Sequence, residues 1–299
     1  MKKITSIGEI LFDVYGNQKK LGGAPFNFIY HIIKLTGQGN FVSRIGNDES
    51  GEKIRRILNE KKISDQFLQT DQTHKTGVAK TNLNNNKVPD FVIKENCAYD
   101  FINQTDDLLK VVNDQTDCLY FGTLAQRNET SRKTIQSLFD KRIKYFCDLN
   151  IRQKFYSKEI IEKSLYAADV LKLNEDELKL VNNLIFKNGY GLNNTAKEVL
   201  KKFKLDLLCV TRGSEGAILF KDNEENSVNI KNNNIIDTVG AGDAYASVLC
   251  IGYLRNLNIE KINQIASQFA NEVVKVEGAL PNDDNIYEEF KEKLLNDEG

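Results

Sequence analysis

Asp237-Thr238-Val239-Gly240-Ala241-Gly242-Asp243 is the stretch of the sequence that says most about the fold. Its two glycines allow a tight turn with several exposed backbone N–H groups. Apolar residues then recur at steps of three and four from Tyr245 to Tyr253, which predicts a helix. Such a turn can bind an anion, because unpaired N–H groups and the helix dipole meet there. A plain helix-capping turn is the alternative, although Asp243 beside an anion suggests a carboxylate that handles a proton or a metal.

Strand-like and helix-like segments alternate along most of the chain. The expected strands are residues 41–45, 118–121, 145–147, 170–173 and 207–210. Helical patterns lie between them, for example at residues 130–139 and 194–203 and in the segment that carries Ile54, Ile57 and Leu58. Several strands are nearly continuous apolar runs, which is typical of parallel strands covered on both faces. The sequence therefore predicts an α/β fold with a parallel sheet between layers of helices.

Two stretches interrupt this alternation. Residues 7–21 show no helical period, and residues 76–102 hold two strand-like runs on either side of Asn84-Asn85-Asn86. Asparagine tolerates turn conformations, so the second stretch is expected to form a β-hairpin. We expect about residues 8–21 and 76–102 to form a small β-sheet lid within a single domain over residues 1–299. A simple extension of the main sheet edge is the alternative.

Charge and composition exclude several classes of protein. The 299 residues carry a formal net charge of -1, which gives no basic surface for nucleic acid or for an anionic membrane. No apolar run approaches the roughly 20 residues that cross a bilayer, and Glu9 and Asp13 interrupt the N-terminal apolar stretch, so no signal peptide is expected. The five cysteines form no CxxC pair and there are two histidines, so no zinc site is expected. We expect a cytoplasmic protein.

Leu21-Gly22-Gly23-Ala24-Pro25-Phe26-Asn27 is a second glycine turn that leads into a helix. Pro25 suits the first helical position, and Gly37 suits the end of the helix. The paired glycines permit a ligand to approach the backbone, and Asn27 can both donate and accept hydrogen bonds. Asp13 adds a carboxylate at the end of an upstream strand. Together these groups suit a polyol, whereas Asp13 alone would be interpreted as a solvated turn residue.

Two further segments place polar groups after apolar strands. Asn174 and Glu177 open a helix one turn apart and face the same way, and their hard oxygen atoms suit Mg²⁺ held through water. A helix cap with acidic first-turn residues is the alternative. The segment 210–217, VTRGSEGA, joins two strand-like runs. It is either a hairpin turn or a loop that places Thr211 and Gly213 beside nucleotide phosphates.

In this order, the motifs resemble those of the ribokinase-like (PfkB) family of sugar kinases over nearly the whole chain. The segments that carry the resemblance are GEILFD (8–13), LGGAPFN (21–27), the Asn174/Glu177 pair, VTRGSEGA (210–217) and DTVGAGD (237–243). Three more segments look most like those of bacterial fructokinases: KENCAYD (94–100), FGTLAQR (121–127) and DLNIRQKFYS (148–157). Phe28-Ile29 departs from the family pattern, because smaller residues are common at that place.

The resemblance implies a doubly wound, mainly parallel sheet flanked by helices, with a β-sheet lid. It implies an ATP-dependent kinase that phosphorylates a sugar primary hydroxyl, with D-fructose as the leading substrate and fructose 6-phosphate as the product. Ribose, 2-keto-3-deoxygluconate and a nucleoside are the alternatives, since a few pocket residues decide between them. A non-catalytic sugar or nucleotide sensor is an alternative of another class. A dinucleotide-dependent oxidoreductase is disfavoured, because no GxGxxG follows the first strand.

The resemblance also implies roles for individual residues. Asp243 would be the catalytic base, with Gly240, Ala241 and Gly242 as the anion hole. The implied substrate-binding residues are Asp13, Gly22, Gly23, Asn27, Lys94, Tyr99 and Arg152. The implied ATP-binding residues are Asn174, Thr211, Gly213, Gly216, Gly240 and Gly242. Asn174 and Glu177 would hold Mg²⁺ through water, and Asp237 with carbonyls near Val239, Val274 and Gly278 would hold a monovalent cation such as K⁺. A small-molecule sugar is the expected partner, and a homodimer through the lids would cover their exposed edges.

Overall fold

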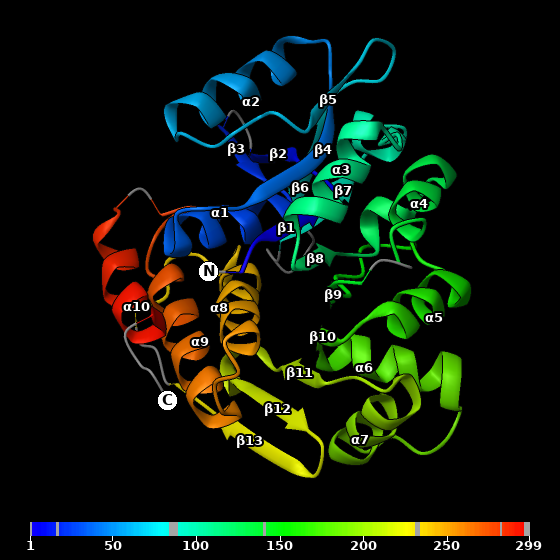
Figure 1. The fold of residues 1–299 in the computed structure, drawn as a ribbon, viewed down its shortest axis with the longest axis vertical. Helices are drawn as coiled ribbons and strands as arrows, with labels where there is room; N and C mark the ends of the chain where they lie inside the picture. Colours follow the sequence, from blue (N-terminus) through cyan, green and yellow to red (C-terminus); the bar gives the residue numbers. More distant parts are fainter. Residues whose placement is uncertain are drawn as a thin grey trace.

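The computed structural model describes residues 2–15, 18–83, 89–139, 142–230, 234–281 and 283–295 (Figure 1). Its centre is a nine-stranded sheet with the order β13-β12-β11-β10-β9-β8-β1-β4-β5. The strands are β1 (Ile4–Ile7), β4 (Asn40–Gly46), β5 (Leu68–Asp71), β8 (Cys118–Phe121), β9 (Lys144–Asp148), β10 (Val170–Asn174), β11 (Leu207–Thr211), β12 (Ala217–Lys221) and β13 (Glu224–Val228). Neighbours from β5 to β11 pair in parallel, and β12 and β13 continue the sheet antiparallel. Each strand predicted for the main sheet falls within one of these strands.

Helices cover both faces of this sheet (Figure 1). One layer contains α1 (Ala24–Thr36), α2 (Glu49–Glu60), α8 (Ala241–Leu254), α9 (Ile259–Val273) and α10 (Asn285–Leu295). The other contains α3 (Asp106–Gln115), α4 (Glu129–Gln136), α5 (Lys158–Ala167), α6 (Glu175–Val181) and α7 (Leu192–Phe203). A separate hydrophobic core fills the space between each layer and the sheet. The predicted α/β architecture is confirmed.

A second, four-stranded sheet stands apart from the first, with the order β3-β2-β6-β7. Its strands are β2 (Leu11–Tyr15), β3 (Gln18–Gly22), β6 (Gly77–Leu83) and β7 (Pro89–Ile93). β6 and β7 form the expected antiparallel hairpin, and β2 joins it by pairing in parallel with β6. The small sheet is therefore separate from the main one and does not extend its edge. The turn at Asn84-Asn85-Asn86 lies outside the described residues.

Two glycine turns set the starts of α1 and α8, which contact each other. Gly23 precedes α1 with φ 111°, and Gly240 precedes α8 with φ 82°. A Cβ at Gly240 would lie 2.4 Å from the Cβ of Ala279, so any other residue would force the chain apart there. Both helices therefore begin near the carboxyl edge of the main sheet, side by side.

Phe28, the departure from the family pattern, is fully buried under α1. Its ring stacks on Tyr120 of β8 with a centroid distance of 3.8 Å and also contacts Phe146 of β9. The larger residue thus fills the space between α1 and the centre of the sheet. It packs the core beneath the turn that carries Asn27.

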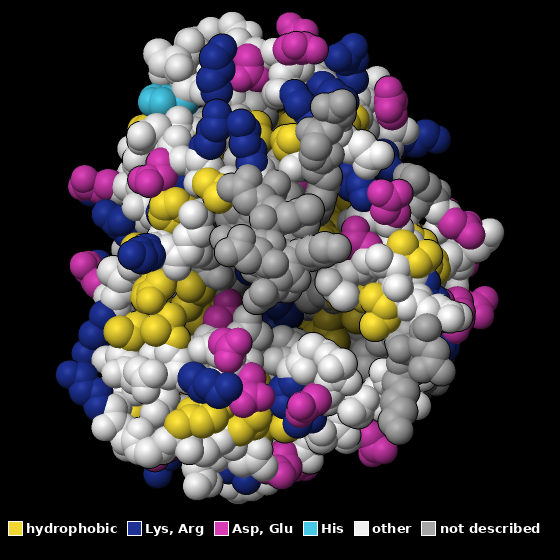
Figure 2. Space-filling model, turned by 180° about the vertical axis from the view of Figure 1, so that it is seen from behind, with side chains coloured by type: hydrophobic (Ala, Val, Ile, Leu, Met, Phe, Trp, Pro, Cys, Tyr) yellow, Lys and Arg dark blue, Asp and Glu magenta, His cyan; other side chains and the backbone are white. Residues whose placement is uncertain are grey.

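Charged side chains of both signs are interspersed over much of the face seen in Figure 2, as the small net charge predicts. Among the described residues, no helix is both long enough and apolar enough to cross a bilayer. All five cysteines are buried free thiols, an environment in which cysteine acts as a small apolar side chain.

Candidate active site

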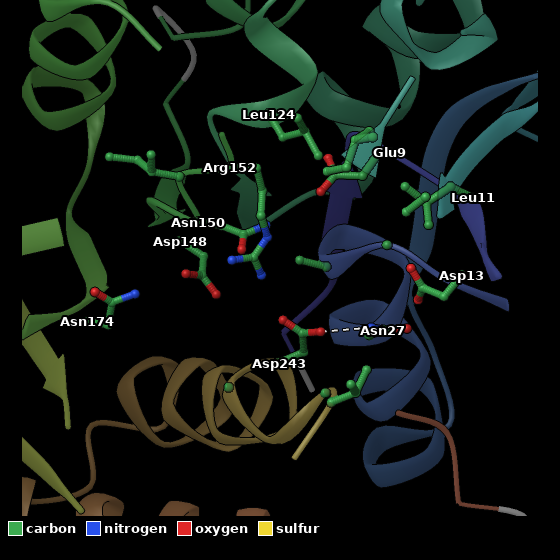
Figure 3. A pocket seen from close by; sticks show the side chains of 18 of the residues that line it. Glu9, Leu11, Asp13, Asn27, Leu124, Asp148, Asn150, Arg152, Asn174 and Asp243 are labelled. Atoms are coloured by element: carbon green, nitrogen blue, oxygen red, sulfur yellow. Dashed lines mark hydrogen bonds between the residues drawn. The ribbon is translucent and has the colours of Figure 1, made fainter. Parts of the chain in front are cut away.

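A cavity of about 570 Å³ opens at the carboxyl ends of the central strands, between the main sheet and the small one (Figure 3). Open α/β sheets commonly bind ligands at this edge. Five carboxyl groups line it: Glu9, Asp13, Asp148, Glu177 and Asp243. We call it the carboxylate-lined cavity. The small sheet contributes Leu11, Asp13, Ala79 and Ile93 to its wall.

Asp243 and Asn27 meet in this cavity from the first turns of α8 and α1. The Asn27 side chain donates a hydrogen bond from Nδ2 to Oδ2 of Asp243 over 2.8 Å, although the two residues are 216 positions apart (Figure 3). Within the described residues, Asp243 Oδ1 accepts no hydrogen bond, and the buried Oδ1 of Asn27 has no partner. The pair therefore offers two oxygen atoms to a ligand.

Burial gives Asp243 an unusual protonation equilibrium. Burial first, and then the negative charge of Asp148, raise the pKa of Asp243 to about 6, while the Asn27 amide, Lys172 and Arg152 oppose the rise. A carboxyl with such a pKa is mostly ionised at neutral pH and yet accepts a proton readily. This is the range in which a general base works best.

Gly23 is required by the protein itself, and Gly22 leaves room for the Asp13 carboxylate. A Cβ at Gly22 would lie 2.5 Å from Oδ2 of Asp13, and a Cβ at Gly23 would lie 2.5 Å from the backbone carbonyl oxygen of Glu9. The sequence suggested that these glycines admit a ligand. In the structure the space beside the two glycines is occupied by the Asp13 carboxylate and the Glu9 backbone. Both acidic residues therefore lie close to the turn before α1.

Asp13 is half-buried on β2, and its side chain points into the cavity (Figure 3). Burial, followed by the charge of Asp243, raises the pKa of Asp13 to about 7. Arg152 enters the same space from the loop after β9, and its charge lowers the pKa values of Glu9, Asp13 and Asp243. The structure thus brings Asp13, Asn27, Arg152 and Asp243 together in one cavity, and the roles that the resemblance implied for them stay predictions.

Lys94 and Tyr99 do not line the cavity. The Lys94 side chain is exposed, and Tyr99 is fully buried against Gly77, where a Cβ would lie 2.6 Å from its ring. The Tyr99 ring packs instead against the guanidinium of Arg127, 5.0 Å away. The structure therefore shows no contact through which either side chain reaches the cavity, and their roles in substrate binding stay predictions.

Sequence reasoning missed a buried ion pair in the cavity wall. Lys172 on β10 donates hydrogen bonds from Nζ to both carboxylate oxygens of Asp148 on β9, over 3.0 and 2.9 Å. The Tyr120 hydroxyl donates a third bond to Asp148 over 3.1 Å. A Cβ at Gly242 would lie 3.4 Å from Lys172 Nζ, so the ammonium group lies beside the glycine turn before α8. The sequence signal for this ion pair is Lys172 itself, a charged residue inside the otherwise apolar run 170–173.

A second cavity of about 470 Å³ adjoins the first on the far side of Gly242. We call it the apolar cavity, because Ile230, Ile235, Tyr245, Ala270 and Val274 line it. Asn174, Thr211, Thr238 and Gly242 line both cavities. Gly213 and Gly216 also face the apolar cavity, from the turn between the antiparallel strands β11 and β12. The hairpin interpretation of VTRGSEGA is thus correct, and the same turn lines a cavity.

Asn174 and Glu177 form a capping box at the start of α6. The Glu177 N–H donates to Oδ1 of Asn174, and the Asn174 N–H donates to Oε2 of Glu177, each over 2.8 Å. The other Glu177 oxygen accepts the N–H of Ile151 over 2.7 Å. Burial raises the pKa of Glu177. The helix cap expected as an alternative is present, and it leaves Glu177 able to reach a metal through water more easily than directly.

The loop expected to hold a monovalent cation is closed by its own hydrogen bonds. The two carboxylate oxygens of Asp237 accept the N–H groups of Val239 and Gly278, over 3.0 and 2.9 Å. The Val274 carbonyl oxygen accepts the N–H groups of both Ile236 and Asp237. The structure therefore brings Asp237, Val239, Val274 and Gly278 together. A cation there would have to share oxygen atoms that already accept hydrogen bonds.

Comparison with known proteins identifies the chain as a carbohydrate kinase. The family model described as pfkB family carbohydrate kinase matches residues 1–285. The fructokinase of Escherichia coli is 27% identical over 241 residues, which are 77% of this chain and 76% of that enzyme. A Pyrococcus horikoshii protein described as an uncharacterized sugar kinase is 26% identical over 318 residues, 97% of each chain.

Solved structures share the fold. The crystal structure of the Pyrococcus horikoshii protein, described there as an uncharacterized sugar kinase, matches with a TM-score of 0.83 and covers 98% of this chain and 100% of its own. A double mutant of the fructokinase from Vibrio cholerae, solved with fructose, ADP and a potassium ion, matches with a TM-score of 0.77 at 24% identity. That match covers 96% of this chain and 98% of the other.

Proposed function

The chain belongs to the pfkB family of carbohydrate kinases, and from this premise we propose that it transfers the γ-phosphate of ATP to the primary 6-hydroxyl of D-fructose. The observation that carries the proposal is the Asn27–Asp243 pair in the carboxylate-lined cavity, directly beside Gly242, which lines both cavities. In this arrangement the sugar occupies the carboxylate-lined cavity and the nucleotide occupies the apolar cavity. The reacting atoms then meet at Gly242, which lines both.

Asp243 is the base in this proposal. The sugar hydroxyl donates its hydrogen bond to the free Oδ1 of Asp243, while Asn27 holds the other carboxylate oxygen in place. A sugar hydroxyl is too weak an acid to ionise first, so the proton moves to Asp243 late, as the new bond forms. Help of this kind contributes about a hundred- to ten-thousand-fold to the rate.

The start of α8 supplies positive potential for the transferred group. Phosphoryl transfer depends mainly on positioning and on stabilising the charge spread over the phosphate oxygens. The N–H groups of Gly240, Ala241 and Gly242 act as an anion hole at the end of the helix dipole. Lys172, next to Gly242, adds a fixed ammonium charge that Asp148 holds in position.

The apolar cavity suits the rest of the nucleotide. Its aliphatic wall offers a surface for the base, and Thr211, Gly213 and Gly216 offer polar and backbone groups to the phosphates. Asn174 and Glu177 at the start of α6 would hold Mg²⁺ through water. The described residues contain no cluster of three His, Cys, Asp or Glu side chains for a metal, which fits an ion bound largely by substrate phosphates and water. When bound, Mg²⁺ neutralises charge on the phosphates.

The small sheet acts as a lid in this proposal. Leu11, Asp13, Ala79 and Ile93 of that sheet wall the carboxylate-lined cavity, and closure over the sugar would exclude water and suppress ATP hydrolysis. Its edges are suited to a homodimer formed through the lids. The potassium ion of the Vibrio cholerae relative motivates a monovalent cation at the loop of Asp237, Val239, Val274 and Gly278.

Fructose is the preferred acceptor in this proposal because named fructokinases resemble the chain over most of its length. The test is ADP release by the purified protein with fructose, ribose, 2-keto-3-deoxygluconate and adenosine. Fructose should give the highest kcat/KM. A higher value with another acceptor would overturn the assignment of fructose, and no release with any of them would favour a sensor that binds without catalysis.

A further inference from the structure

Glu9 lies in the carboxylate-lined cavity and has no role in the transfer described so far. It follows β1, which lies between β8 and β4 where the strand order of the parallel sheet reverses, and its backbone carbonyl lies close to Gly23. The residue is 1% exposed, and its Oε2 has no hydrogen-bond partner within the described part of the chain. Buried side-chain oxygens are nearly always paired in folded proteins, so this one requires an explanation.

The surroundings of Glu9 argue against a structural purpose. A carboxyl retained for the fold would be held by an ion pair or by several donors. The charged groups that act on Glu9 are Arg152, Arg127 and Asp243, and no hydrogen bond joins any of them to it in the described structure. Burial is the largest cause that raises the pKa of Glu9, to about 7. Burying an unpaired carboxyl group costs folding stability, and a group of this kind in a cavity is a candidate for ligand contact.

The geometry shows where that contact would be made. In Figure 3 the Glu9 carboxyl and the Arg152 guanidinium enter the cavity from the side opposite Asp243 and Asn27. A ligand between them would face Asp243 with one end and Glu9 with another. An unpaired carboxyl oxygen there can accept a hydrogen bond from a hydroxyl group, as Asp13 can at the small sheet.

The charge at this end of the cavity selects the class of ligand. Glu9, Asp13 and Asp243 contribute three carboxyl groups, whereas Arg152 and Lys172 are the cationic residues among the described lining residues. Lys172 is already paired with both oxygens of Asp148. An acceptor with its own carboxylate or phosphate would therefore meet more negative than positive charge, at low dielectric, where repulsion is strong.

We propose that Glu9 is a further substrate-binding residue, which accepts a hydrogen bond from a sugar hydroxyl and makes the site selective for uncharged polyols over acceptors that carry a carboxylate or a phosphate. The inference rests on the sugar kinase activity above, but not on fructose itself. Any neutral sugar that the protein phosphorylates would serve in the same way.

The test compares wild type with Glu9→Gln and Glu9→Asp, using ADP release from fructose, ribose, 2-keto-3-deoxygluconate and fructose 6-phosphate. Glu60→Gln is the matched control, since Glu60 is exposed at the end of α2, outside both cavities. Wild type should use only the neutral sugars. Glu9→Gln should raise KM for the best neutral sugar about ten- to a hundredfold, as expected for loss of a charged hydrogen bond, with kcat changed less than about threefold. Its selectivity against the two anionic acceptors should fall by about tenfold or more.

Glu9→Asp separates contact from charge. It keeps the negative charge but withdraws the carboxyl by one methylene, so KM for the neutral sugar should rise while the exclusion of anionic acceptors persists. A thermal melt of each variant shows whether it folds. If Glu9→Gln does not fold, the KM and selectivity of Glu9→Asp still test the proposal. Unchanged KM and selectivity in both variants would overturn the proposal, as would a wild type that prefers an anionic acceptor. Activity with ribose in place of fructose would overturn only the assignment of fructose.

Discussion

The two adjoining cavities are built in opposite ways from the same edge of the sheet. The carboxylate-lined cavity gathers ionisable groups with raised pKa values, the buried Glu9 and the half-buried Asp13 and Asp243. The apolar cavity uses backbone turns and aliphatic side chains, such as Ile235 and Val274. In the proposed function the first cavity discriminates between substrates through charge and hydroxyl contacts, and burying these groups costs stability. In the same proposal the other would hold the nucleotide by shape and by backbone N–H groups, which cost little stability.

The largest loss of stability is expected where the two cavities meet, from Lys172→Met. Removing the ammonium group leaves Asp148 buried without its cation, and breaking a buried pair in this way costs about 3–5 kcal/mol of the free energy of unfolding. Urea unfolding measures the change. The double variant Lys172→Met with Asp148→Asn should recover much of the loss. A single variant as stable as wild type would show that the pair does not organise the junction.

A smaller effect of opposite sign is expected from Glu9→Gln in the unliganded protein. The pKa of Glu9 in the folded state is about 7, above its ordinary value of 4.5, so its contribution to stability is present below pH 4.5 and is lost as the pH rises through 7. Glutamine avoids this loss. At pH 8 the variant should be more stable than wild type by up to about 3 kcal/mol, and at pH 4.5 the two should be nearly equal.

Urea midpoints at the two pH values test this prediction, with Glu60→Gln as the control that should not change. A Glu9→Gln protein that is less stable at both pH values would mean that Glu9 serves the fold. Asp13→Asn should change stability with pH in the same direction, because the pKa of Asp13 is also raised to about 7.

The smallest effect is expected in the apolar cavity, from Ile235→Ala. The Ile235 side chain is 53% exposed, so its truncation removes little buried area from the fold and only part of the wall for the nucleotide base. We expect KM for ATP to rise about two- to tenfold with KM for the sugar unchanged. Steady-state kinetics with each substrate varied in turn measures both. A larger change for the sugar than for ATP would place the nucleotide elsewhere.

The sequence predicted the parts of the site that arise locally. The glycine turns before α1 and α8, the five main-sheet strands β4, β8, β9, β10 and β11, and the hairpin of the small sheet follow from spacing and turn chemistry. Asn27 and Asp243 were identified because each stands next to such a turn. Their mutual hydrogen bond was not foreseeable, because it joins two helices distant in the sequence.

What the sequence could not predict depends on packing between distant segments. The bond between Lys172 and Asp148 requires the register of β9 against β10, and no local pattern reports it. Glu9 stood in a quoted motif, yet only the fold shows that its carboxyl is buried in the cavity without a partner. For Tyr99 the motif suggested a substrate contact, which stays a prediction, and the structure shows its ring packed against Gly77.

The measurement that tests the central claim most directly is made on Asp243→Asn. The change keeps the shape of the side chain but removes the base, so kcat with the preferred sugar should fall about a hundred- to ten-thousand-fold. The dissociation constant of the sugar, measured by calorimetry, should stay within a few-fold of wild type. A variant with near-normal kcat would contradict the account, because Asp243 would then not take the proton from the sugar.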